Sequence, residues 1–176
     1  MKIKKTLTTL ALTGLLTAVL AAPALAADKT IVAPATTAGS PVTATVDQTY
    51  TVTIPDTVNF GTLTKASKDV VKDLTVKVNN LLIDKNQTLK INVKGDDTTT
   101  ANAFTIRTTG GASIAYEVYN KSSTKVNPNS EFAAVTSADT PDTEQDVSGK
   151  LKQTGDVVHS GSYTGTLTFT CTVATP

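Results

Sequence analysis

Hydrophobic and polar residues alternate one by one along several short stretches of the chain. The clearest stretch is residues 166–173, where four threonines alternate with Leu167, Phe169, Cys171 and Val173. Because successive side chains of a β-strand point to opposite faces, this stretch has one apolar face and one hydroxylated face. It predicts a half-buried strand at the end of the chain. A terminal segment of this kind is ordered only if the preceding chain forms a sheet that it can join.

The same alternation recurs earlier in the chain. It predicts strands over residues 50–54, 70–78, 89–93, 104–106 and 114–118. Gly110-Gly111 lies between the last two and predicts a β-hairpin, because two glycines permit positive φ at both turn positions. Gly61, directly after Phe60, predicts a bend or a bulge. No segment after the first 26 residues keeps a 3.6-residue apolar period over three turns, which favours an all-β protein.

Eight or so short strands, with turn signals about every ten residues, are typical of a β-sandwich. We therefore predict an immunoglobulin-like antiparallel β-sandwich with Greek-key connections over residues 49–176. Within it, residues 120–160 are expected to form a long polar insertion in which only residues 132–135 and 150–153 resemble short strands. Such insertions are often functional, so a recognition surface is expected there first.

The first 26 residues have the features of a secretory signal peptide. Three lysines precede an apolar run over residues 7–20, and small residues around Ala26 supply a cleavage site. The run is short for a membrane helix, no charged stop follows it, and no second apolar span occurs, so a retained helix is the weaker alternative. We expect cleavage after Ala26, no membrane contact afterwards, and a secreted or cell-surface location.

Residues 27–48 are rich in Ala, Thr and Pro and predict an extended arm, with a possible edge strand over residues 42–46. An antiparallel sandwich has unpaired edge strands. The arm could cover such an edge of its own domain or donate itself to a neighbouring copy.

Composition and charge argue against some classes of function. The signal peptide holds three of the 16 basic residues and none of the 15 acidic ones, which leaves 13 against 15 and offers no electrostatic surface for nucleic acid. After its removal 30 of 150 residues are Thr, which suits exposed strand faces. Cys171 is the only cysteine, so no intramolecular disulfide can form, and we expect it to pack as an inert thiol.

No combination of residues predicts catalysis, a metal or a cofactor. His159 is the only histidine and is expected at the surface, because triads and metal sites need further partners. Acidic residues at 96–97 and 139–146 lack the spacing of a calcium loop. Glu117 is expected to face solvent. A remote alternative is that it lies beside a strand lysine such as Lys77 or Lys90 and promotes a crosslink between that lysine and an asparagine. A hydrolase is the least supported function.

Two local features resemble known families. One is the closing stretch with Tyr163, Gly165, Leu167 and Phe169, and the other is the Phe60-Gly61 pair. Together they resemble the WxL-type domains of Gram-positive surface proteins, although Phe169 stands where those domains have Trp. This resemblance implies a non-enzymatic structural or adhesive protein held non-covalently to the cell wall, with a wall polymer or other surface proteins as partners.

The same features also resemble fimbrial subunits of the chaperone–usher and spore-coat-U kinds. These proteins usually contain a cysteine pair, which this chain lacks, and they polymerise by donating an N-terminal strand. The alternative prediction is therefore a pilus-like or matrix subunit that self-associates through residues 27–48.

Overall fold

The computed structural model describes residues 32–34, 37, 40–97, 103–137 and 143–175. The predicted signal peptide lies outside these residues. The chain divides into two compact units, residues 1–44 and 45–176, and all the strands lie in the second. No helix in the described part of the chain is long and apolar enough to cross a membrane.

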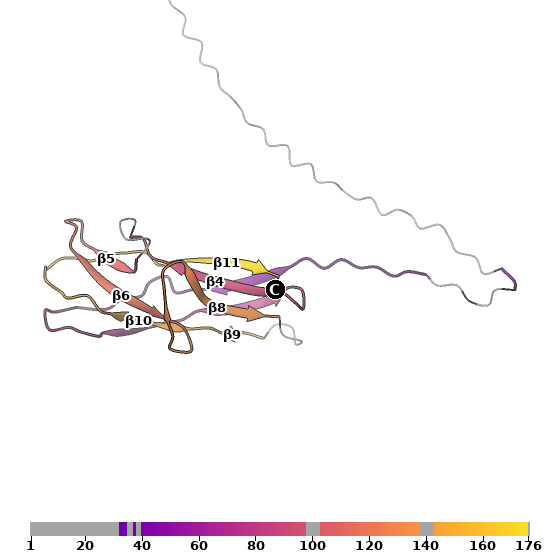
Figure 1. Ribbon diagram of the computed structural model, residues 1–176, viewed down its shortest axis with the longest axis horizontal. Helices are drawn as coiled ribbons and strands as arrows, with labels where there is room; N and C mark the ends of the chain where they lie inside the picture. The colour runs from indigo at the N-terminus through magenta and orange to yellow at the C-terminus, as the bar shows by residue number, and fades with distance from the viewer. Residues whose placement is uncertain (1–31, 35–36, 38–39, 98–102, 138–142, 176) are drawn as a thin grey trace, which may run out of the picture. The chain divides into compact units, whose positions relative to one another are not determined.

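The second unit is built from β-strands joined by turns and irregular segments (Figure 1). In chain order, the strands are β1 (Thr49–Thr53), β2 (Val71–Leu74), β3 (Lys77–Leu82), β4 (Thr88–Lys94), β5 (Thr105–Arg107), β6 (Ser113–Tyr119), β7 (Lys125–Val126), β8 (Ser130–Thr136), β9 (Gln145–Asp146), β10 (Gly149–Gln153) and β11 (Thr168–Ala174). Every strand pair is antiparallel.

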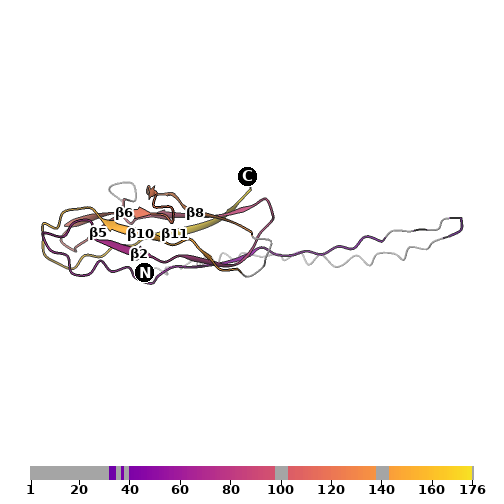
Figure 2. The ribbon, with the colours of Figure 1, turned by 90° about the horizontal axis from the view of Figure 1, so that it is seen from below.

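These strands form three hydrogen-bonded sheets. The largest has the order β2-β10-β6-β5, with β7 also paired to β6, and the others have the orders β11-β4-β8 and β1-β3-β9. Most neighbours are far apart in sequence, as Greek-key connections require. Figure 2, turned by 90°, shows the strands running lengthwise along the domain. The predicted immunoglobulin-like antiparallel β-sandwich is confirmed.

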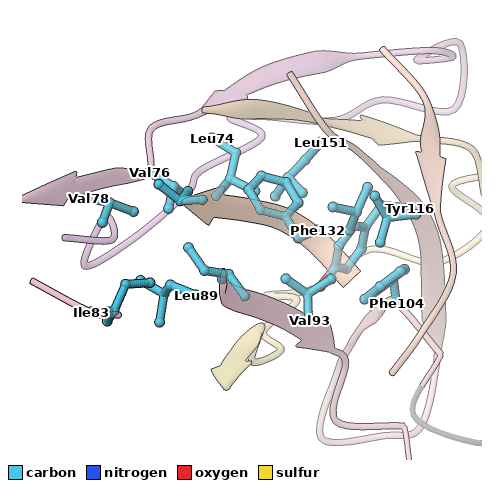
Figure 3. Close-up of a cluster of buried hydrophobic side chains, with 14 residues drawn as sticks. Leu74, Val76, Val78, Ile83, Leu89, Val93, Phe104, Tyr116, Phe132 and Leu151 are labelled. Carbon is cyan, nitrogen blue, oxygen red and sulfur yellow. The ribbon is translucent and has the colours of Figure 1, made fainter. Parts of the chain in front are cut away.

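The core is mainly aliphatic, with a few aromatic rings, and lies between the sheets. Leu74 and Leu151 of the larger sheet point toward Leu89 and Val93 of β4, and the Phe132 ring lies between them (Figure 3). Each of these side chains is at most 4% exposed. Without a disulfide, the burial of these side chains is the main stabilising contribution, about 1.5–3 kcal/mol for each fully buried large side chain.

The predicted hairpin around Gly110-Gly111 is present as β5 and β6, which pair Ile106 with Ile114. Only Gly111 has a positive φ, of 86°, because the turn spans five residues and is closed by a hydrogen bond from Thr108 N to Ala112 O. The predicted strand over 70–78 is in fact two strands. The chain leaves the larger sheet after Leu74 and enters the β1-β3-β9 sheet at Lys77.

Residues 120–160, expected to form a polar insertion, contribute four strands to the sheets. Two of them, β8 and β10, contain the short patterns recognised in the sequence. The other two, β7 and β9, are two residues long and are held by pairing with β6 and β3. The alternation of apolar and polar residues is weak in β7 and β9 because such short strands bury only one side chain or none.

Gly149 allows β10 to approach its neighbours closely. A Cβ atom at this position would lie 2.1 Å from the Tyr119 carbonyl oxygen and 2.9 Å from the Phe132 ring. A side chain there would therefore have to displace both β6 and the central aromatic ring of the core.

We predict that Gly149→Ala lowers the free energy of unfolding by about 1–3 kcal/mol, the usual effect of overpacking a close-packed core. Gly110→Ala is the matched control, because its nearest neighbouring atom would be 3.8 Å away. It should change stability by less than about 0.5 kcal/mol. Urea denaturation followed by circular dichroism measures both, and equal stability of the two variants would contradict this role of Gly149.

Candidate binding groove

One edge of β11 is unpaired among the described residues. The strand pairs with β4 on one side, with Phe169 opposite Val93, Cys171 opposite Ile91 and Val173 opposite Leu89. The three β4 side chains are at most 1% exposed, whereas their β11 partners are only half-buried. Both sets pack against the core, and the difference in burial is consistent with β11 being the last strand of its sheet in the part of the chain that the structure describes.

A second segment lies across from the start of β11 and from the chain that leads into it, without forming a strand. Residues 54–65 follow β1 and contain the half-buried side chains of Val58, Phe60 and Leu63. All three alternate or nearly alternate with exposed residues, yet the segment forms no strand. It therefore resembles a strand whose neighbour is missing.

Two hollows lie between this segment and the chain leading into β11. One of about 900 Å³ is bounded by residues 57–65 and 157–165, and one of about 300 Å³ by residues 54–58 and 165–169. They share the lining residues Val58, Phe60, Ile106 and Gly165, so they form one continuous groove. We call it the β11 groove. Its two walls run antiparallel to each other, because rising numbers on one wall face falling numbers on the other.

Aromatic contacts fix the floor of the β11 groove. The Phe60 and Tyr116 ring centroids are 5.9 Å apart, and the Tyr116 and Phe104 centroids are 5.7 Å apart. On the other wall Phe169 packs edge-on against Phe132 with centroids 6.0 Å apart. Offset and edge-on contacts of this kind contribute about 0.5–1.5 kcal/mol each beyond burial, so the floor is preformed.

Local sequence explains the shape of each wall. Gly61 has a φ of 82° and its N–H donates to Asn59 Oδ1 over 2.7 Å, which makes the bend predicted from the sequence. Gly165 lies where a Cβ atom would be 2.5 Å from the Thr105 carbonyl oxygen, so only glycine lets this wall lie against β5. The Thr166 N–H donates to Asp96 Oδ2 over 2.9 Å and holds the entry to β11.

All six residues of the two sequence motifs line the β11 groove. They come from distant parts of the chain and are Phe60, Gly61, Tyr163, Gly165, Leu167 and Phe169. The sequence did not identify Ile54, Ile106, Tyr116 and Leu151, which also line it. These four belong to ordinary alternating patterns, and nothing in such a pattern distinguishes a core position from a groove position.

The polar residues considered for chemistry do not assemble into a reactive site. His159 is exposed, and its carbonyl oxygen accepts a hydrogen bond from the Tyr163 hydroxyl over 2.8 Å. Asp97 forms an ion pair with Arg107. The described residues contain no group of three His, Cys, Asp or Glu side chains that could hold a metal ion. What the groove offers a ligand is an apolar floor and the free backbone groups of a strand edge.

Glu117 is paired rather than simply solvated. Its carboxylate accepts hydrogen bonds from Lys125 Nζ over 2.5 Å and from the Tyr119 hydroxyl over 2.6 Å. The Lys125 ammonium, followed by the Tyr119 hydroxyl, lowers the pKa of Glu117. Its partner is thus a lysine of β7 and not Lys77 or Lys90, each of which pairs with a different glutamate.

Comparison with known proteins supports the fold. No protein-family model matches the chain, and no curated protein matches it significantly. The crystal structure of the P pilus rod subunit PapA matches with a TM-score of 0.50 and 21% sequence identity, over 70% of this chain and 99% of that chain. A structure of a chaperone–usher pilus, solved to explain rod uncoiling, matches with a TM-score of 0.51 and 18% identity, over 82% of this chain and 99% of that chain. At these identities the likeness establishes a shared β-sandwich fold.

Tyr116 on the groove floor gives a test of the local packing. Burial, with a smaller effect of the Asp96 carboxylate, raises the pKa of Tyr116 to about 12, whereas an unfolded tyrosine titrates near about 10. Between these values the unfolded state loses a proton that the folded state keeps. The free energy of unfolding therefore falls as the pH rises through this window.

We predict that raising the pH from about 9 to about 11 lowers the free energy of unfolding of the domain without residues 27–48. The decrease should be about 1 kcal/mol larger than in the same domain carrying Tyr116→Phe. Denaturant unfolding at the two pH values measures this difference. An equal loss in both proteins would show that Tyr116 is not buried in the groove floor.

Proposed function

We propose that this protein is a secreted, non-enzymatic structural subunit that polymerises on the cell surface by strand exchange. The arm of one copy, residues 27–48, inserts into the β11 groove of another copy. The observation that carries this proposal is the half-buried inner face of β11, beside a wall segment that pairs with nothing in the described structure. An added strand would bury the face and pair the backbone.

The arm has the composition of such a strand. From Thr30 to Val46 it contains 17 residues and none of them is charged. The side chains of its valines are exposed to solvent: the exposed fractions of Val42 and Val46 are 96% and 71%. An uncharged segment with exposed, alternating apolar side chains loses little by entering a groove with an apolar floor and gains their burial, about 25 cal/mol for each Å² of apolar surface.

The likeness to two pilus structures favours this proposal over attachment to a cell wall. Both are pilus proteins, and almost the whole of each compared chain superposes on this one. The expectation of wall binding rested on the WxL-type resemblance, and no family model matches the chain. A groove that takes a strand also accounts for all six motif residues, which a wall-binding role leaves unexplained.

We predict that removing residues 27–48 leaves a folded domain that cannot assemble. The deletion removes the strand and leaves the core untouched, so circular dichroism should report the same β-structure. Light scattering and electron microscopy should report monomers where the full mature chain forms high-molecular-weight fibres. Assembly that is unchanged by the deletion would contradict strand exchange.

We further predict that the truncated domain binds a synthetic peptide of residues 27–48 and ignores a scrambled peptide of the same composition. The matched composition separates strand pairing from general hydrophobic adsorption. Added to full-length protein, the truncated domain should shorten the fibres in proportion to its amount, because it accepts an arm and donates none. Equal binding of the two peptides would argue against a specific groove.

A further inference from the structure

One wall of the β11 groove is a connecting segment and not a strand. Residues 157–166, between β10 and β11, all line one or the other of the two hollows. We call this segment the strap. Its position relative to residues 54–65 sets the width of the groove. All of its residues except Val157 and Tyr163 are exposed, so the burial of apolar side chains does little to hold it in place.

Backbone hydrogen bonds hold the two ends of the strap. Just before it begins, the Gly155 N–H donates to Ala115 O of β6 over 2.9 Å. Near its end, Thr164 and Arg107 exchange two hydrogen bonds, of 2.7 and 2.9 Å. The strap is therefore fixed to β6 at one end and to the last residue of β5 at the other.

The side chain of Arg107 is itself held by the chain that leaves β4. Its guanidinium forms an ion pair with Asp97, whose side chain is 3% exposed, and its Nε donates to Thr105 Oγ1 over 3.4 Å. Asp97 comes three residues after the end of β4. The ion pair therefore ties the end of β5, and with it Thr164 of the strap, to the end of β4.

Asp96 makes a second attachment from the same place. Its Oδ2 accepts the Thr166 N–H over 2.9 Å, two residues beyond Thr164. Asp96 is exposed whereas Asp97 is buried, so the two neighbouring carboxylates bond to different segments. We call Asp96, Asp97 and Arg107 the strap clamp. Both of its attachments act on the last three residues of the strap.

The Asp97–Arg107 pair differs from other ion pairs of the domain. In five others among the described residues, both side chains are at least 24% exposed. Exposed pairs contribute little to stability, whereas removing one member of a pair with a buried partner leaves that partner's charge uncompensated. Arg107 is also the only arginine among the 16 basic residues. Its planar group presents two nitrogens to two partners at once, which a lysine ammonium cannot match.

We propose that the strap clamp preorganises the β11 groove. Asp96, Asp97 and Arg107 are positioning residues, which fix the end of the strap and thereby the width of the groove before a ligand binds. A ligand that enters a groove with a fixed wall avoids the entropic cost of ordering that wall. That the clamp holds the strap follows from the contacts alone, whereas its effect on assembly rests on the proposed strand exchange.

Hydrogen exchange followed by mass spectrometry tests the clamp in the mature chain, residues 27–176, diluted until light scattering reports monomers. Arg107→Gln removes the ion pair. Asp96→Ala removes the acceptor of the Thr166 N–H and leaves no buried charge unpaired. In both variants the amides of residues 164–166 should exchange at least about tenfold faster, the equivalent of one hydrogen bond to a charged group.

The amides of β4 and β10 report whether the effect is local. They should be accelerated less than those of the strap in Arg107→Gln, and by less than about twofold in Asp96→Ala, because local opening leaves the core closed. Lys90→Gln is the matched control, because it removes one charge of the exposed pair that Lys90 forms with Glu131. It should leave exchange in the strap unchanged.

The second readout is the protein concentration at which half of the mature chain assembles, measured by light scattering. It should rise about tenfold in Arg107→Gln and stay constant in Lys90→Gln.

The other outcomes separate the clamp from the proposed function. Strap exchange that is unchanged in both clamp variants, or accelerated no more than exchange in β4 and β10, would overturn the clamp. Faster strap exchange with unchanged assembly would contradict its role in preorganising the groove. If the unmodified mature chain assembles at no concentration, the proposed function fails, and exchange in the strap still decides whether the clamp holds it.

Discussion

The edge of β11 that pairs with no other described strand is the constraint on which the rest of the structure depends. A strand edge carries a row of backbone donors and acceptors that must pair with water or with another strand. Alternate side chains of that strand, and Leu167 just before it, pack against the core. Leu167, Phe169, Cys171 and Val173 are all only half-buried. Unpaired backbone groups and half-buried apolar side chains thus lie along the same edge, and the proposed added strand would pair the first and cover the second.

Packing in the rest of the domain holds the residues around this edge in place. β4 is the central strand of the β11-β4-β8 sheet, and its inward side chains are fully buried. Phe132 joins the core to Phe169, while Phe60 and Phe104 flank Tyr116. These aromatic rings hold the groove floor in place even though the chain has no disulfide. The close contact at Gly149 belongs to the same design, since it brings β10 and β6 against Phe132.

Alternation in the sequence was sufficient to predict much of this fold. The regular spacing from Thr166 onward specified β11, and the Gly110-Gly111 pair specified the hairpin of β5 and β6. The prediction was less complete where strands are short or change sheets. Two-residue strands such as β7 have no period to detect, and the crossing between Leu74 and Lys77 leaves the alternation uninterrupted while the pairing partners change.

The groove itself could not be predicted, although its motif residues could be singled out. Phe60 and Phe169 have the same alternation that a fully covered strand would have, because a period of two identifies the inward face and carries no information about the neighbour. Ile106 and Tyr116 were identified only as parts of strands. Whether a strand has neighbours on both sides depends on the whole sheet order. The open edge became visible only when half-buried β11 could be compared with fully buried β4.

The most direct test of the account is hydrogen exchange at the amides of β11. Alternate amides of this strand bond to β4, and the others, called groove-facing below, lie at its outer edge and point away from β4. The account predicts that the groove-facing set exchanges rapidly in the domain without residues 27–48 and slowly in the assembled full-length protein, while the β4-facing set is protected in both. Rapid exchange of the groove-facing amides in assembled fibres would contradict it.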